Sequence, residues 1–196
     1  MPITKIPAVR ILGIIAIVAS PWIFIDFINN GLYDRFVFTS ASGIRSFIFM
    51  TGWICSVVGL YKLGAMGSKP WQRMMVIIQM VLLCLANVWC VLEIFDPGSP
   101  SKLFFLLNFT WPVGGVFMMV TSIVIILAKR LKGWRRYIPL LAGLWFPQTI
   151  LIYFIDRHSI TLLLLSGIYS VVAFSLLGFI LVTENKLTTM PPVYRP

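Results

Sequence analysis

Six long stretches of the chain consist predominantly of apolar residues. They cover roughly residues 8–28, 45–64, 74–95, 103–128, 136–155 and 160–183. A helix that crosses the hydrocarbon core of a bilayer needs about 20 such residues, because it must satisfy its own backbone hydrogen bonds there. The pattern therefore predicts an all-α integral membrane protein, a bundle of six transmembrane helices.

The connections between these stretches are short and contain turn-forming residues, such as Asn29-Asn30-Gly31 and Asp96-Pro97-Gly98. No connection is long enough to form a separate soluble domain. Residues 1–186 are thus predicted to form a single six-helix domain, and residues 187–196 a short proline-rich tail.

The first apolar stretch could be mistaken for a signal peptide. It continues through Pro21 to Ile28, which is too long for a cleaved segment, so we expect it to be the first span. Its tripeptide Ser20-Pro21-Trp22 resembles the one that names the bacterial SPW-repeat membrane proteins. The tripeptide occurs once and covers a single helix, so we do not assign the chain to that family.

The composition supports lipid exposure. Hydrophobic residues make up 59% of the 196 residues and charged residues 11%, with a mean hydropathy of +0.95. In soluble domains, about 45–50% of the residues are hydrophobic and about 25% are charged. This balance argues against a soluble enzyme, a disordered regulator or a nucleic-acid-binding domain. The formal net charge of +10 is better explained by membrane topology than by a nucleic-acid partner.

The basic residues indicate the orientation. Most of the Lys and Arg residues lie at the N-terminus, in the second and fourth connections and in the tail, and only Arg35, Arg45, Lys102 and Arg157 lie on the other side. Because basic residues accumulate on the cytoplasmic side, both termini are predicted to be cytoplasmic, in a plasma or inner membrane. The fourth connection is predicted to bind anionic lipid headgroups through Lys129, Arg130, Lys132, Arg135 and Arg136.

Acidic residues follow the opposite distribution and are predicted to form an outer acidic rim, consisting of Asp26, Glu93, Asp96 and Asp156.

No ionisable residue lies at the middle of a span, which argues against a proton pump, a voltage sensor or a retinal protein. In the third span, helical spacing places Gln79, Ala86, Cys90 and Glu93 on one face, with Asn87 at its edge.

Neutral polar residues within the spans allow two interpretations. They could form interhelical hydrogen bonds, each worth about 0.6 kcal/mol, together with close contacts such as Gly52-x-x-x-Ser56 and Ser166-x-x-x-Ser170. Alternatively, they could line a cavity that opens towards the acidic rim and binds or conducts a neutral or amphipathic small molecule. The predicted ligand-binding residues are Gln79, Asn87, Asn108, Trp111, Gln148, Tyr169 and Ser170.

Two other functions stay open. The chain could be a non-catalytic subunit or scaffold whose small-residue faces contact a membrane partner or a second copy of the chain. It could also be a lipid-acting enzyme, if Asp26, Glu93, Asp96 and His158 converge; no nucleophile–base motif favours an enzyme. The spacing of the three cysteines and the single histidine predicts no metal site and no cofactor.

Overall fold

The computed structural model describes residues 6–30, 38–99, 101–156 and 159–184, and within these ranges all regular structure is helical. Six helical segments are long and apolar enough to cross a membrane, which confirms the predicted number. The predicted tail, residues 187–196, lies outside the described residues. In chain order the helices are α1 (Ile6–Ala19), α2 (Pro21–Asn30), α3 (Ser40–Lys62), α4 (Pro70–Phe95), α5 (Lys102–Ala128), the 3₁₀ helix η1 (Gly133–Tyr137), α6 (Ile138–Asp156) and α7 (Ile160–Thr183).

Side-chain caps determine where several helices begin. The hydroxyl of Thr39 accepts a hydrogen bond from the backbone N–H of Ser42 at 3.0 Å, and Ser101 and Ser159 cap α5 and α7 in the same way. These caps satisfy backbone donors that the first turn of a helix leaves free. Helix α3 therefore begins at Ser40, five residues before the predicted start of the second span.

The first predicted span is one candidate crossing but consists of two helices, α1 and α2, separated at Ser20. Pro21 has no backbone N–H and cannot continue the hydrogen bonds of α1. The Ser20 hydroxyl donates to the Ile17 carbonyl at 2.9 Å and contacts the Ser175 hydroxyl of α7 at 2.6 Å. The predicted single crossing is confirmed, and within it α7 supplies a polar partner at the break between α1 and α2.

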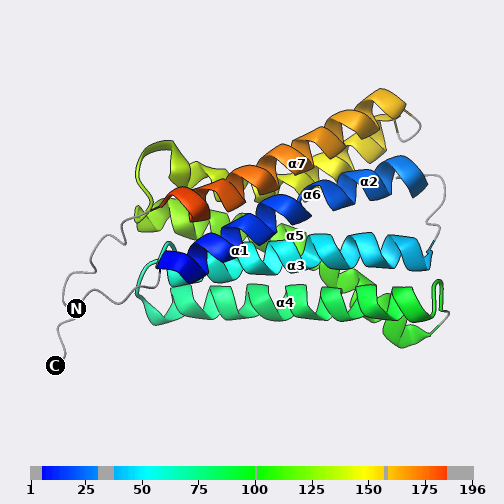
Figure 1. Ribbon diagram of the computed structural model, residues 1–196, viewed down its shortest axis with the longest axis horizontal. Helices are drawn as coiled ribbons and strands as arrows, with labels where there is room; N and C mark the ends of the chain where they lie inside the picture. Colours follow the sequence, from blue (N-terminus) through cyan, green and yellow to red (C-terminus); the bar gives the residue numbers. More distant parts are fainter. Residues whose placement is uncertain (1–5, 31–37, 100, 157–158, 185–196) are drawn as a thin grey trace.

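The spans form a closed ring. Helix α1 contacts α3, and contacts continue from α3 to α4, α5, α6 and α7, which returns to α1. Figure 1 shows these helices running along the long axis of the molecule, with the start of α1 and the end of α7 at the same end. Residues on neighbouring helices can therefore meet inside the ring, whatever their distance in sequence.

Aromatic side chains fill the centre of this ring. Phe49 and Trp53 of α3, Trp145 of α6 and Phe174 of α7 are at most 2% exposed. The ring of Phe49 lies 4.9 Å from that of Phe174 and 5.9 Å from that of Trp145, in edge-to-face geometry. Such pairs add about 0.5–1.5 kcal/mol beyond the burial of their area. The middle of the described bundle is thus a packed aromatic layer.

Large apolar side chains cover the outside of the ring. Val18, Leu106, Leu127 and Ile155 are each about two-thirds exposed, and many further Ile, Leu, Val and Phe residues point outwards. Soluble monomers rarely expose continuous apolar surfaces of this kind. The six apolar helices are compatible with a multipass integral membrane protein.

Small residues allow the helices to approach closely. A Cβ atom at Gly178 would lie 2.7 Å from the carbonyl oxygen of Gly13, and one at Gly52 would lie 2.3 Å from the Cβ of Ala19. Ser166, in the other small-residue pattern, is fully buried. These small residues thus contact neighbouring helices of the same chain, and the function as a subunit or scaffold stays a prediction.

We expect Gly178→Ala to lower the free energy of unfolding by about 1–3 kcal/mol, since overpacking forces backbones apart. Thermal unfolding in detergent would measure the loss. Gly114→Ala is the matched control, because its Cβ would meet its nearest neighbour, Leu83, at an ordinary 3.4 Å. Equal stability of the two variants would contradict the close approach of α1 and α7.

Candidate functional site

The two amides of α4 that were predicted to bind a ligand each bond to a different neighbouring helix. The amide nitrogen of Gln79 donates to the carbonyl of Gly114 in α5 at 3.1 Å. The amide nitrogen of Asn87 donates to the hydroxyl of Thr51 in α3 at 3.3 Å. Helix α4 therefore presents its polar groups to both of its neighbours.

The candidates on α6 and α7 form separate contacts. The Tyr169 hydroxyl donates to the carbonyl of Leu141 at 2.7 Å, which joins α7 to α6, and Ser170 bonds within its own helix. The oxygen of Gln148 accepts a long hydrogen bond, 3.5 Å, from Ser166. These contacts fit the interpretation of interhelical hydrogen bonds.

The two remaining candidates lie on α5. The Trp111 ring packs edge-to-face against Trp145 at 5.3 Å and against Phe146 at 5.6 Å. Asn108, one turn earlier, is half-buried. The structure thus distributes the seven predicted residues over α4, α5, α6 and α7, where the described contacts do not join them into one site.

Helix α4 has the buried face that its helical spacing predicted. Gln79, Ala86, Cys90 and Glu93, which helical spacing placed on one face, are all at most 1% exposed. We call these four residues, together with Asn87 at their edge, the polar face of α4. This face lies against α3 and α5.

The polar face of α4 contains three buried acceptors that lack a donor. The oxygens Gln79 Oε1, Asn87 Oδ1 and Glu93 Oε2 have no hydrogen-bond partner among the described residues. An unsatisfied buried acceptor costs about 1–3 kcal/mol. Such groups in a folded protein require an explanation, such as an ordered water or a ligand.

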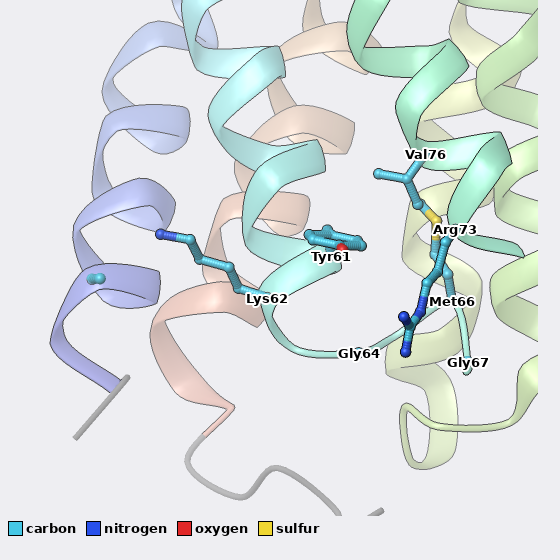
Figure 2. Close-up of a pocket in the computed structure, with 8 residues that line it drawn as sticks. Tyr61, Lys62, Gly64, Met66, Gly67, Arg73 and Val76 are labelled. Atoms are coloured by element: carbon cyan, nitrogen blue, oxygen red, sulfur yellow. The ribbon is translucent and has the colours of Figure 1, made fainter. Parts of the chain in front are cut away.

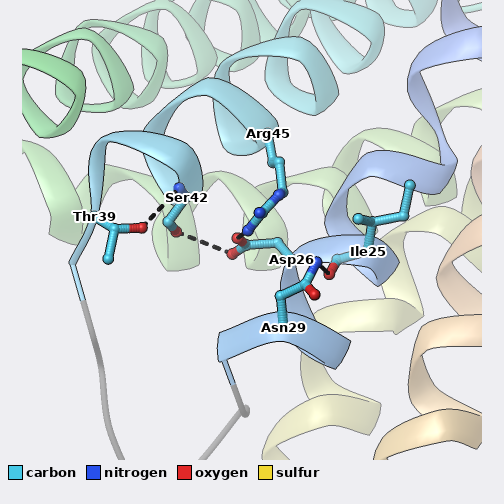
Figure 3. A network of polar contacts seen from close by, with 6 residues as sticks. All are labelled: Ile25, Asp26, Asn29, Thr39, Ser42 and Arg45. Atoms are coloured by element: carbon cyan, nitrogen blue, oxygen red, sulfur yellow. Dashed lines mark hydrogen bonds and ion pairs between the residues drawn. The ribbon is translucent and has the colours of Figure 1, made fainter.

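At the end of the bundle formed by α2 and the start of α3, Asp26 belongs to a polar network (Figure 3). Its Oδ1 accepts from the guanidinium of Arg45 at 3.1 Å, and its Oδ2 accepts from the hydroxyl of Ser42 at 3.0 Å. Ser42 and Arg45 lie three residues apart, on one side of the first turns of α3. This spacing lets both side chains reach one carboxylate.

Glu93 of α4 lies beside the same network, close to Ser42, Thr39 and Asp26. Glu93 is 1% and Asp26 8% exposed, whereas Asp96 and Asp156 are exposed. Of the predicted acidic rim, the structure thus buries two members and leaves two on the surface.

This arrangement meets part of the requirement for a lipid-acting enzyme. Asp26 and Glu93 converge on Ser42, while Asp96 lies on the surface at the end of α4. His158, the fourth residue of that hypothesis, lies outside the described residues.

The predicted headgroup-binding residues lie between α5 and α6. Arg135 forms an ion pair with Glu184 at 2.5 Å, and Arg136 donates to the hydroxyl of its neighbour Tyr137 at 2.6 Å. Lys129 and Lys132 are exposed, and Arg130 is half-buried. Two of the five cations therefore have protein partners, and headgroup binding by this connection stays a prediction.

Comparison with known proteins finds no matching family model, no matching curated protein and no matching solved structure.

We expect Arg45→Met to lower the free energy of unfolding by about 1.5–3 kcal/mol, because it leaves a buried carboxylate without a charged donor. Lys102→Met, which removes an exposed cation at the same end, is the control and should change stability by less than about 0.5 kcal/mol. Denaturant unfolding of both variants, and of Arg45→Met in an Asp26→Asn background, measures how much the contact between Arg45 and Asp26 contributes to stability. A loss that persists in that background would contradict the pairing.

Proposed function

We propose that this chain is an integral membrane protein with both termini in the cytoplasm, in a plasma or inner membrane. Its apolar outer surface supports insertion, and its charges support the orientation. One end of the ring contains the cations Lys62, Lys69, Arg73, Lys129, Arg130, Lys132, Arg135 and Arg136, with the carboxylate Glu184. The opposite end contains Asp26, Glu93, Asp96 and Asp156, with the cations Arg45 and Lys102. The basic end is the one expected in the cytoplasm.

We further propose that the polar face of α4 binds a small amphipathic molecule. The observation that supports this most is the set of three buried oxygens, on Gln79, Asn87 and Glu93, without donors among the described residues. A molecule that donates hydrogen bonds to them would recover much of the cost of burying them. Helix α4 carries these acceptors from its middle to the acidic end, where such a molecule would enter.

The chemistry of the face indicates the class of ligand. All three free groups are acceptors, so the ligand must provide O–H or N–H donors. The residues between them, including Leu83, Ala86 and Cys90, are apolar, so we expect the rest of the ligand to be apolar. An amphipathic alcohol or amine meets both requirements.

Binding is favoured over conduction by the aromatic layer. Phe49, Trp53, Trp145 and Phe174 occupy the centre of the ring with at most 2% exposure. A continuous path through this centre would require several large buried side chains to move together, and protein interiors resist such changes.

The double variant Gln79→Leu/Asn87→Leu tests the ligand site. It removes two of the three acceptors, together with two interhelical bonds worth about 0.6 kcal/mol each, so we expect little change in stability. Small molecules released by denaturing the purified protein would be compared by mass spectrometry. We expect the wild type to release a species that the double variant lacks.

Gln148→Leu is the matched control, because Gln148 lies at the interface of α6 and α7 and not on α4. This variant should retain the same species. The proposal fails if the wild type releases nothing above a mock purification, or if the double variant releases the same species in the same amount.

A further inference from the structure

A cavity of about 410 Å³ lies at the basic end of the bundle, lined by the end of α3, the loop that follows it, the start of α4 and Ala8 of α1. Figure 2 shows its walls, which include Tyr61, Lys62, Gly64, Gly67 and Arg73. Its volume falls in the range of small-molecule sites, about 300–1,000 Å³. The cavity does not include any of the residues that the sequence predicted to bind a ligand or a headgroup.

The end of α3 gives one wall of this cavity a fixed shape. The N–H of Gly64 donates to the carbonyl of Tyr61 at 2.9 Å, and the N–H of Ala65 donates to that of Leu60 at 3.0 Å. These two bonds form a Schellman motif, which needs the left-handed conformation that Gly64 adopts with φ of 63°. Ala65 is fully buried beneath the loop and anchors it.

The start of α4 fixes the other wall. The backbone N–H of Lys69 donates to the side-chain oxygen of Gln72 at 3.0 Å, and Pro70 occupies the first helical position. Gly67, with φ of 94°, passes so close to Gln72 that an added Cβ would lie 2.4 Å from the Gln72 oxygen. The loop is thus held at both ends.

The cavity has an excess of positive charge. Lys62 and Arg73 are its charged lining residues, and none of the described residues that line it is a carboxylate. Among the described residues, neither cation takes part in an ion pair, and the one described carboxylate at this end, Glu184, is bound by Arg135. The N-terminus of α4 adds the positive end of a helix dipole. A preformed pocket with these groups favours an anion.

We propose that this cavity binds a phosphate group. Lysine and arginine are the side chains that recognise phosphate most readily, and the Tyr61 hydroxyl provides a further donor. The expected source is the headgroup of an anionic phospholipid, because Tyr61 and Trp71 beside the cavity are almost half exposed at the helix ends, where headgroups lie. This choice of source rests on the proposed membrane insertion; recognition of phosphate does not.

Native mass spectrometry of the full chain in detergent, titrated with dioleoyl-phosphatidylglycerol or dioleoyl-phosphatidylcholine, tests the proposal. We expect the wild type to prefer phosphatidylglycerol. The double variant Lys62→Gln/Arg73→Gln should bind it at least about 30-fold more weakly, since it loses two charge-assisted contacts to the phosphate, each worth at least about 1 kcal/mol. Arg73→Lys keeps a point charge that still binds phosphate, so it should lose much less affinity than the double variant.

Lys69→Gln/Lys102→Gln is the matched control, because it removes the same charge from exposed residues that do not line the cavity. Its affinity for phosphatidylglycerol should fall by less than about threefold. A loss of that size is expected when exposed charges that do not contact the lipid are removed. Equal losses in the two double variants, or equal binding of the two lipids by the wild type, would overturn the proposal.

Inorganic phosphate distinguishes the two sources. If millimolar phosphate stabilises the wild type against heat, displaces phosphatidylglycerol and does neither in Lys62→Gln/Arg73→Gln, the cavity recognises free phosphate. If phosphatidylglycerol binds and phosphate does not displace it, the headgroup is the source. Both measurements are made in detergent, so they are independent of the orientation and of the ligand proposed for α4.

Discussion

On the proposed insertion into a membrane, the absence of water in a bilayer core is the constraint on which this structure depends. Every backbone polar group there needs a partner within the chain, and helices of 22 to 27 residues in six candidate spans meet that need. Their outward faces are Ile, Leu, Val and Phe, which acyl chains can solvate. The same constraint applies to side chains, and it explains why Gln79, Asn87 and Tyr169 each reach a group on a neighbouring helix.

Lipid does not drive helices together as water does, because it is as apolar as their side chains. Association therefore depends on close packing. Gly13 and Gly178 bring α1 and α7 into backbone contact, and the aromatic layer around Phe49 fills the ring on the inside. At one end, where α2, α3 and α4 meet, the buried hydrogen bonds of Asp26 connect α2 to α3. Packing and this network together define a closed bundle.

The spans were predictable from the sequence because length and hydropathy are local properties. The start of α3 was not predictable in this way, because the Thr39 cap and the ion pair between Arg45 and Asp26 are not part of the apolar pattern. Helical periodicity predicted the buried face of α4, but periodicity in one helix does not reveal which neighbour it meets. For the same reason, the convergence of Asp26 and Glu93 on Ser42 could not be predicted. Lys62 and Arg73 were assigned only to topology, since a cavity depends on a loop conformation that composition does not specify.

Single-cysteine labelling in intact cells tests the central claim most directly. With the three native cysteines replaced by alanine, Lys132→Cys and Ser99→Cys place one thiol at each end of the ring. If the apolar helices cross the membrane with the basic end inside, a membrane-impermeant maleimide labels residue 99 in intact cells and residue 132 only after lysis. Labelling of both residues from one side, or release of the chain from membranes by alkali, would contradict the account.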